Sequence, residues 1–138
     1  MKFTSYLFFL FFIFMNCTAQ KLLDLKEVTY EANTRGKNME LKITADSIIY
    51  KDNHKIKKLK TTSDTWKEIT KIASKIDMHS IANFNPPSEK RISDKALHAT
   101  LKVDVNDGLY VSQVFDHGNP PKELKRLIDL LFKVAEFK

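Results

Sequence analysis

The chain has 138 residues, with 23 Lys and Arg against 17 Asp and Glu, and a formal net charge of +6. This length suits one domain with one hydrophobic core and leaves little room for a second. The single cysteine is Cys17, so residues 20–138 can form no disulfide, no thiol nucleophile and no cysteine-ligated metal site.

The first nineteen residues predict export. Lys2 precedes an apolar run over residues 7–15, which is too short to span a bilayer but fits the core of a secretory signal peptide. Cys17 and Ala19 then supply the small side chains that a signal peptidase recognises before its cleavage site. We therefore expect cleavage after residue 19, a mature chain that begins at Gln20, and a periplasmic or secreted location.

An alternative interpretation makes Cys17 the lipidated first residue of an outer-membrane lipoprotein. Lipoprotein signal peptidases prefer a small residue before that cysteine, and here it is Asn16. The sequence therefore favours a soluble exported form, and we expect membrane attachment only if Cys17 is lipidated.

Alternating apolar and polar residues predict strands in the first half of the chain. The pattern is clear over residues 28–33 and 39–44, which flank a turn at Arg35-Gly36. Residues 47–50 form a third predicted strand, and residues 55–60 form a less regular fourth.

A helix is predicted after these strands and should end near Asp77. Ser63, Asp64 and Thr65 are its candidate caps, and Thr65 and Glu68 have the spacing of a capping box. The apolar residues recur at helical spacing: Trp66, Ile69, Ile72, Ala73 and Ile76.

The second half of the chain repeats this arrangement. Residues 97–105 alternate without a break, Asp107-Gly108 is a strong hairpin signal, and residues 109–115 return as a strand. Asn119 is then the expected cap of a helix with Pro120 in its first turn. One face of that helix is apolar: Leu124, Leu127, Ile128, Leu131, Val134 and Ala135.

These elements predict one α+β domain over residues 20–138. We expect an antiparallel sheet of about five to six strands, with two helices packed on one of its faces. The order of elements gives two hairpin–helix units.

The segment from Asp116 to Pro121 is the first candidate site, since it presents an acid, an imidazole and a helix start in one rigid loop. We predict a ligand-binding role for Asp116, His117, Gly118 and Asn119, in which the helix N-terminus would favour an anionic group. The structural alternative explains the same residues: Asp116 bonds the loop backbone, Gly118 adopts a positive φ, and Asn119 caps the helix.

Strand register adds His98 to this candidate site. If Asp107-Gly108 is a two-residue turn, His98 lies opposite His117, with Cβ atoms about 4.5–5.5 Å apart, and Arg91 could join them from the preceding loop. The two imidazoles could then couple their titrations or share a metal, although a one-residue bulge would remove the pairing. Two histidines without a third ligand are weak support for a metal, so we predict no metal site and no cofactor.

Residues 51–60 contain five lysines and His54. Such a segment can attract anionic partners, but no aromatic residues interleave with it and the protein is expected to be exported, so nucleic acid is not the expected partner. Lysines on a strand also block edge-to-edge pairing between sheets, and we favour this interpretation.

The layout resembles small exported domains of unknown function from Bacteroidota-type bacteria. The matching residues are Gly118-Asn119-Pro120-Pro121 before Leu124 and Leu127, with Thr18-Ala19-Gln20 at the end of the signal. The resemblance implies the fold and transfers no activity and no catalytic residue.

Signatures of the common hydrolases, metalloproteases and phosphate-binding enzymes are missing from the sequence. The sequence therefore favours a non-catalytic binding module, such as an inhibitor or an accessory subunit, with a protein or envelope component as its partner. The alternative is a small hydrolase or metal-dependent enzyme that uses His98, His117 and Asp116.

Overall fold

The computed structural model describes residues 23–136, whose framework is an antiparallel sheet. The strands are β1 (Leu25–Thr34), β2 (Lys37–Thr44), β3 (Ser47–Asp52), β4 (Ile56–Lys60), β5 (His98–Val105), β6 (Gly108–Val111) and β7 (Phe115–Asp116). Helix α1 (Ser63–Ala73) follows β4 and helix α2 (Lys122–Val134) follows β7, while two short 3-10 helices, η1 (Met78–Asn83) and η2 (Lys90–Ser93), lie between α1 and β5. The predicted signal peptide, its cleavage site and Cys17 lie outside the described residues.

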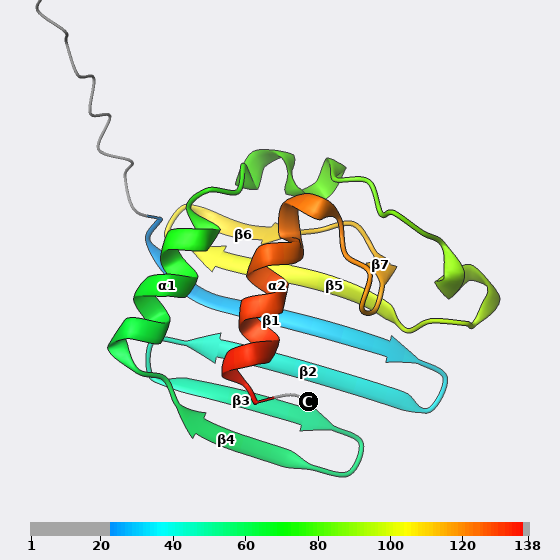
Figure 1. Ribbon diagram of the computed structural model, residues 1–138, viewed down its shortest axis with the longest axis horizontal. Helices are drawn as coiled ribbons and strands as arrows, with labels where there is room; N and C mark the ends of the chain where they lie inside the picture. Colours follow the sequence, from blue (N-terminus) through cyan, green and yellow to red (C-terminus); the bar gives the residue numbers. More distant parts are fainter. Residues whose placement is uncertain (1–22, 137–138) are drawn as a thin grey trace, which may run out of the picture.

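The strands lie in the order β4-β3-β2-β1-β5-β6, and β7 pairs with β5 beyond the end of β6. All neighbouring pairs are antiparallel. Hairpin β3–β4 leads into α1, and hairpin β5–β6 is followed by α2 (Figure 1). The predicted α+β class with two hairpin–helix units is confirmed, but the single strand predicted over residues 109–115 is divided into β6 and β7, with residues 112–114 outside both.

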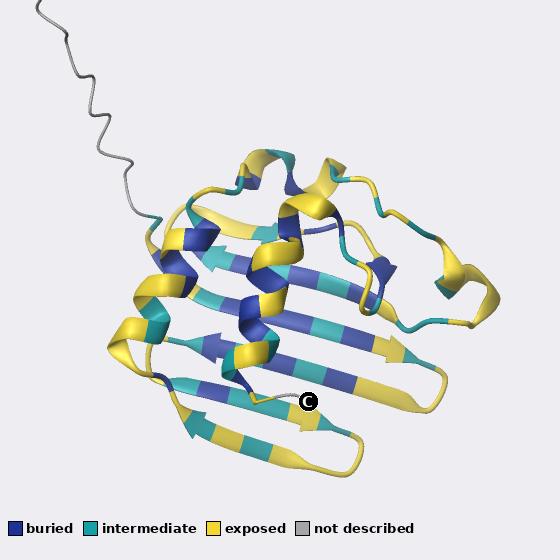
Figure 2. Ribbon diagram, viewed as in Figure 1, coloured by how far each residue is buried: buried dark blue, intermediate teal, exposed yellow. Residues whose placement is uncertain are grey.

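Both helices pack on the same face of the sheet, as predicted. Buried and less buried residues alternate along β2 and β5, because successive side chains point to opposite faces (Figure 2). The strand side chains that face the helices form the core with the apolar stripe of each helix. Tyr30 and Phe115 are the largest fully buried side chains of this core.

Helix α1 begins differently from the prediction. Thr62 is its N-cap, and the Thr62 side chain accepts a hydrogen bond from the Thr65 backbone N–H at 3.1 Å. The predicted caps at 63–65 and the capping box of Thr65 with Glu68 are therefore wrong. The reason is that Thr61 still donates its N–H to the sheet, so the helix starts as soon as strand pairing stops.

Helix α1 also ends before the predicted end at Asp77. Its last residue is Ala73, and the Ser74 hydroxyl turns back to donate to the Thr70 carbonyl at 2.7 Å. The N–H groups of Lys75 and Ile76 then donate to carbonyls three residues back, as in a 3-10 turn, and the helix ends there. Asp77 instead caps η1, where it accepts the backbone N–H of His79 at 3.1 Å.

The expected cap of α2 is wrong as well. The helix starts at Lys122 with Pro121 in the N-cap position, and no side chain caps it. Asn119 lies in a turn instead, where its N–H donates to the Asp116 carbonyl at 2.9 Å and its side chain donates to Ser88. The extended backbone of Pro121 separates Asn119 from the helix, so the amide cannot reach the first-turn N–H groups.

Candidate functional site

Asp116 anchors a long loop. Its side chain is 1% exposed, and its carboxylate accepts the Ser88 hydroxyl, the backbone N–H of Lys90 at 2.8 Å and that of Arg91 at 2.9 Å. The Arg91 guanidinium adds a contact at 3.3 Å. A carboxylate has about four acceptor sites, so these donors use its capacity. Asp116 thereby holds the loop that contains η2 against the end of the sheet.

The charge state of Asp116 follows from these contacts. Burial by itself raises the pKa of this carboxyl, but the hydrogen bonds from Ser88, Arg91 and Lys90 outweigh it and lower the pKa to about 2. The carboxylate is therefore ionised across the neutral range. Its negative charge is balanced within the loop by the half-buried Arg91.

Three of the predicted site residues lie together here: Asp116, Arg91 and Asn119. Arg91 and Asn119 both donate to Asp116, and both also donate to Ser88. Arg91 Nη1 donates to the Ser88 carbonyl at 2.8 Å, and Asn119 Nδ2 donates to the Ser88 hydroxyl at 2.7 Å. Gly118 has a φ of +82°, which a side chain would strain. The predicted positive φ of Gly118 is confirmed. The Asp116 carboxylate, however, binds the backbone of the loop that contains η2 and not that of its own loop, because the N–H groups of Lys90 and Arg91 reach it from there. A ligand role of the loop stays a prediction.

His117 points away from Asp116, toward the core. Its Nδ1 lies 2.8 Å from the Tyr30 hydroxyl, and its ring contacts the ring of Phe132 on α2 with centroids 6.1 Å apart. The backbone N–H of Gly118 also interacts with the Tyr30 oxygen, and the tautomer of His117 sets whether the hydroxyl or Nδ1 donates the proton between them. Burial, and then the charge of Lys37, lower the pKa of His117. The neutral imidazole is the favoured form.

The predicted pairing of His98 with His117 is wrong. The turn is formed by residues 106–107, so that Val105 lies opposite Gly108, and His98 lies opposite Asp116. The register changes by one residue between β6 and β7, which places His117 beside Tyr30 in the core and leaves the His98 side chain exposed.

A serine explains this change of register. Ser112 donates its backbone N–H to the Leu101 carbonyl at 2.9 Å, while its hydroxyl oxygen accepts the Leu101 N–H at 3.0 Å. The side chain thus takes the place of a backbone acceptor in the ladder, and one extra residue fits between β6 and β7. Within residues 23–136, no group of three or more His, Cys, Asp or Glu is arranged to hold a metal ion.

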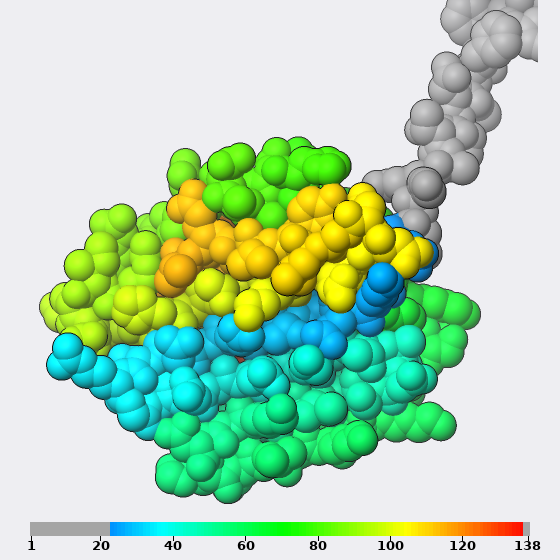
Figure 3. All heavy atoms as spheres, turned by 180° about the vertical axis from the view of Figure 1, so that it is seen from behind, coloured from blue at the N-terminus to red at the C-terminus, as the bar shows by residue number. Residues whose placement is uncertain are grey.

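The second face of the sheet presents a different arrangement of charged groups. Over the described part of the chain no helix covers this face: both helices lie on the other face in Figure 1, and Figure 3 shows β2, β1 and β5 at the surface. Three ion pairs cross the face between neighbouring strands: Lys42 with Glu27 at 3.1 Å, Lys51 with Glu40 at 3.1 Å and Lys102 with Glu31 at 2.7 Å. We call this surface the open face.

Two carboxylates oppose each other at the middle of the open face. Glu31 and Glu40 are direct partners in the β1–β2 register, and like charges in such positions destabilise a sheet. Lys102 and Lys51 compensate them from either side. Each of the opposed acids therefore depends on a lysine of the next strand for its charge balance.

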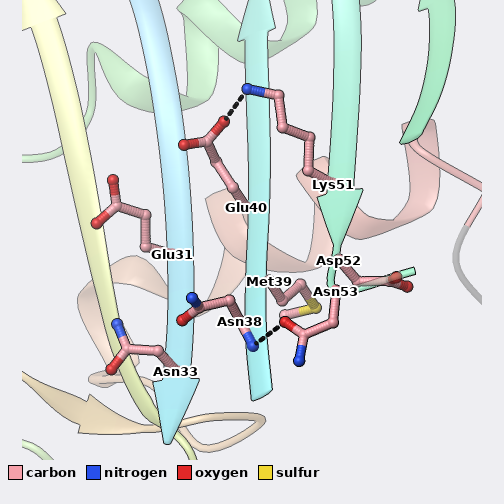
Figure 4. Close-up of a pocket in the computed structure, with 8 residues that line it drawn as sticks. All are labelled: Glu31, Asn33, Asn38, Met39, Glu40, Lys51, Asp52 and Asn53. Carbon is pink, nitrogen blue, oxygen red and sulfur yellow. Dashed lines mark hydrogen bonds and ion pairs between the residues drawn. The ribbon is translucent and has the colours of Figure 1, made fainter. Parts of the chain in front are cut away.

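Two adjoining hollows meet at this acid pair. The larger, of about 440 Å³, is also lined by Asn53, whose Oδ1 accepts the Asn38 N–H at 2.8 Å (Figure 4). The smaller, of about 220 Å³, extends across β1 and β5 to Leu109. Glu31 and Glu40 line both hollows.

Nothing in the sequence alone marks the open face as a site. Alternation does place Glu31, Glu40, Lys42 and Lys102 on the polar side of their strands, but β1 and β5 are far apart in sequence. The acid pair itself follows from the β1–β2 hairpin, because a two-residue turn at Arg35-Gly36 sets Glu31 opposite Glu40.

Among residues 23–136, neither α1 nor α2 has the length and apolar character of a membrane-spanning helix. Comparisons of the chain with protein-family models, with curated proteins and with solved structures found no match.

Proposed function

We propose that this protein is an exported, non-catalytic module that binds a protein or envelope component through the open face of its sheet. One observation carries the proposal: two adjoining hollows meet at the opposed Glu31 and Glu40 on the face that both helices leave free. Opposed like charges reduce sheet stability, and features that work against folding occur preferentially where they serve function.

The chemistry of the open face favours a polar protein partner. Two central acids are flanked by Lys51 and Lys102, so a complementary surface would gain specificity and association rate from matched charges. Leu109 is 60% exposed and Val111 is 36% exposed at the β6 side of the face, and they offer apolar area beside Lys102. A charged centre with an apolar margin suits a partner that carries both kinds of group.

The test reverses two of the three ion pairs of the open face without changing the net charge. Glu40→Lys with Lys51→Glu, and Glu31→Lys with Lys102→Glu, keep each pair opposite in sign but invert the pattern that a partner meets. Exposed pairs contribute about 0–1 kcal/mol to stability, so the variant should fold. Capture from envelope extract should retain a partner on the natural protein and lose it on this variant.

A matched control exchanges Lys125 and Asp129, an exposed ion pair at 2.7 Å on α2. Lys125→Asp with Asp129→Lys should retain the partner. Equal capture by all three proteins would place the contact elsewhere, and loss by both variants would indicate a nonspecific charge effect.

A further inference from the structure

The two edges of the sheet differ in how they are protected. At one end, η1 lies against β6, and the His79 ring meets the Tyr110 ring edge-on with centroids 5.4 Å apart. At the other end, β4 pairs with β3 and with no further strand among residues 23–136 (Figure 1). Such an edge presents unpaired backbone donors and acceptors.

The register identifies which backbone groups of β4 are free. Asp52 donates its N–H to the Lys55 carbonyl at 2.9 Å, and Thr61 donates to Asp46 at 3.2 Å, so these are hydrogen-bonded pairs of the β3–β4 ladder. Hydrogen-bonded and non-hydrogen-bonded pairs alternate in an antiparallel ladder. The backbone groups of Ile56, Lys58 and Lys60 therefore point away from β3.

The side chains of the same three residues all lie on one face of the sheet, along its edge. They share one face because they alternate with Lys57 and Leu59, whose partners Tyr50 and Ile48 lie on the helix side. Ile56 is 74% exposed. Neither Lys58 nor Lys60 makes an ion pair with any described residue, whereas Lys57 pairs with Glu136 at 2.9 Å.

We propose that the free edge of β4 binds an extended acidic segment of another protein, which adds to the sheet as a further antiparallel strand. The incoming strand would place two acidic side chains beside Lys60 and Lys58 and an apolar side chain beside Ile56. Main-chain hydrogen bonds would supply affinity, and the alternate side chains would supply specificity.

The same lysines exclude the other occupant of a free edge, which is a second copy of this chain. Two copies of β4 would bring lysine against lysine, and like charges opposite each other destabilise pairing. An acidic strand turns that repulsion into attraction. The basic edge therefore selects a partner by charge.

The experiment titrates purified protein with a blocked peptide of sequence Thr-Glu-Thr-Glu-Thr-Val-Thr and follows backbone amides by NMR. We expect saturable shifts concentrated in β4 and slower hydrogen exchange at Ile56, Lys58 and Lys60. The same peptide N-methylated at both glutamates keeps its charge but lacks the donor N–H groups, so it should bind at least about tenfold more weakly.

A charge exchange on the protein tests the side-chain part of the site. Lys58→Glu with Lys60→Glu should lower affinity for the acidic peptide about tenfold and create binding of the peptide with lysine in place of glutamate. Equal binding of the N-methylated peptide, or shifts spread over all surface lysines, would overturn strand addition in favour of general attraction to polyanions. Concentration-dependent protection of β4 without peptide would overturn it in favour of self-association. Each result is independent of the ion-pair exchanges on the open face.

Discussion

The hydroxyl of Tyr30 connects the core to the segment after β7, and Tyr30→Phe isolates its contribution. The side chain is fully buried, and its oxygen bonds His117 Nδ1 at 2.8 Å and the Gly118 N–H. A net protein hydrogen bond is worth about 0.5–1.5 kcal/mol. His117 is half-buried and Gly118 exposed, so water can partly replace both bonds. We expect a loss of about 1–2 kcal/mol in unfolding free energy, because the ring still fills its site.

Urea unfolding at pH 8, where His117 is neutral, measures this loss as a lower midpoint with an unchanged slope. His117→Ala and the double variant complete a cycle, and the coupling between the two residues should be about 1 kcal/mol. A coupling below about 0.3 kcal/mol, within the error of additivity, would refute the claim that the hydroxyl holds His117.

The remaining predictions concern acid stability, the core and export. Asp116 has a folded pKa of about 2, below its ordinary unfolded value of about 3.9, so its contribution is present above pH 4 and is lost as pH falls toward 2; acid titration of Asp116→Asn should lack this component. His117 has a lowered pKa, so folding stability should also decline as pH falls below about 6.5, and His117→Ala should lack that decline. Leu127→Ala removes a fully buried side chain of α2 and should cost about 2–5 kcal/mol in thermal or urea unfolding. Mass spectrometry of the exported protein should find Gln20 as its first residue, whereas a lipid-modified Cys17 would show the alternative processing.

Local pattern was sufficient to predict most of the fold. The alternation along β1, β2 and β5 and the helical spacing of α1 and α2 depend only on near neighbours in sequence, and each face was predicted from them. Helix ends were less predictable, because they depend on neighbouring structure. Thr62 is the N-cap of α1 because strand pairing ends just before it, and Pro121 occupies the N-cap position of α2 because the turn over residues 116–119 ends just before it.

The candidate site was harder to predict, because it depends on register and on distant contacts. The hydroxyl of Ser112 replaces a backbone acceptor and shifts the ladder by one residue, which separates His98 from His117. The donors that use up the Asp116 carboxylate come from residues about 25 positions away in the chain. No local pattern indicates that Ser88 lies against that carboxylate.

The open-face contact can be tested most directly by cross-linking. Cys17 is the only cysteine of the chain, so in a Cys17→Ala background a single new cysteine can carry a photoreactive label. Lys42→Cys places the label on the open face and Lys125→Cys places it on α2. Binding through the open face predicts a cross-linked partner from position 42 and none from position 125. Cross-links from position 125 alone would contradict the proposed function.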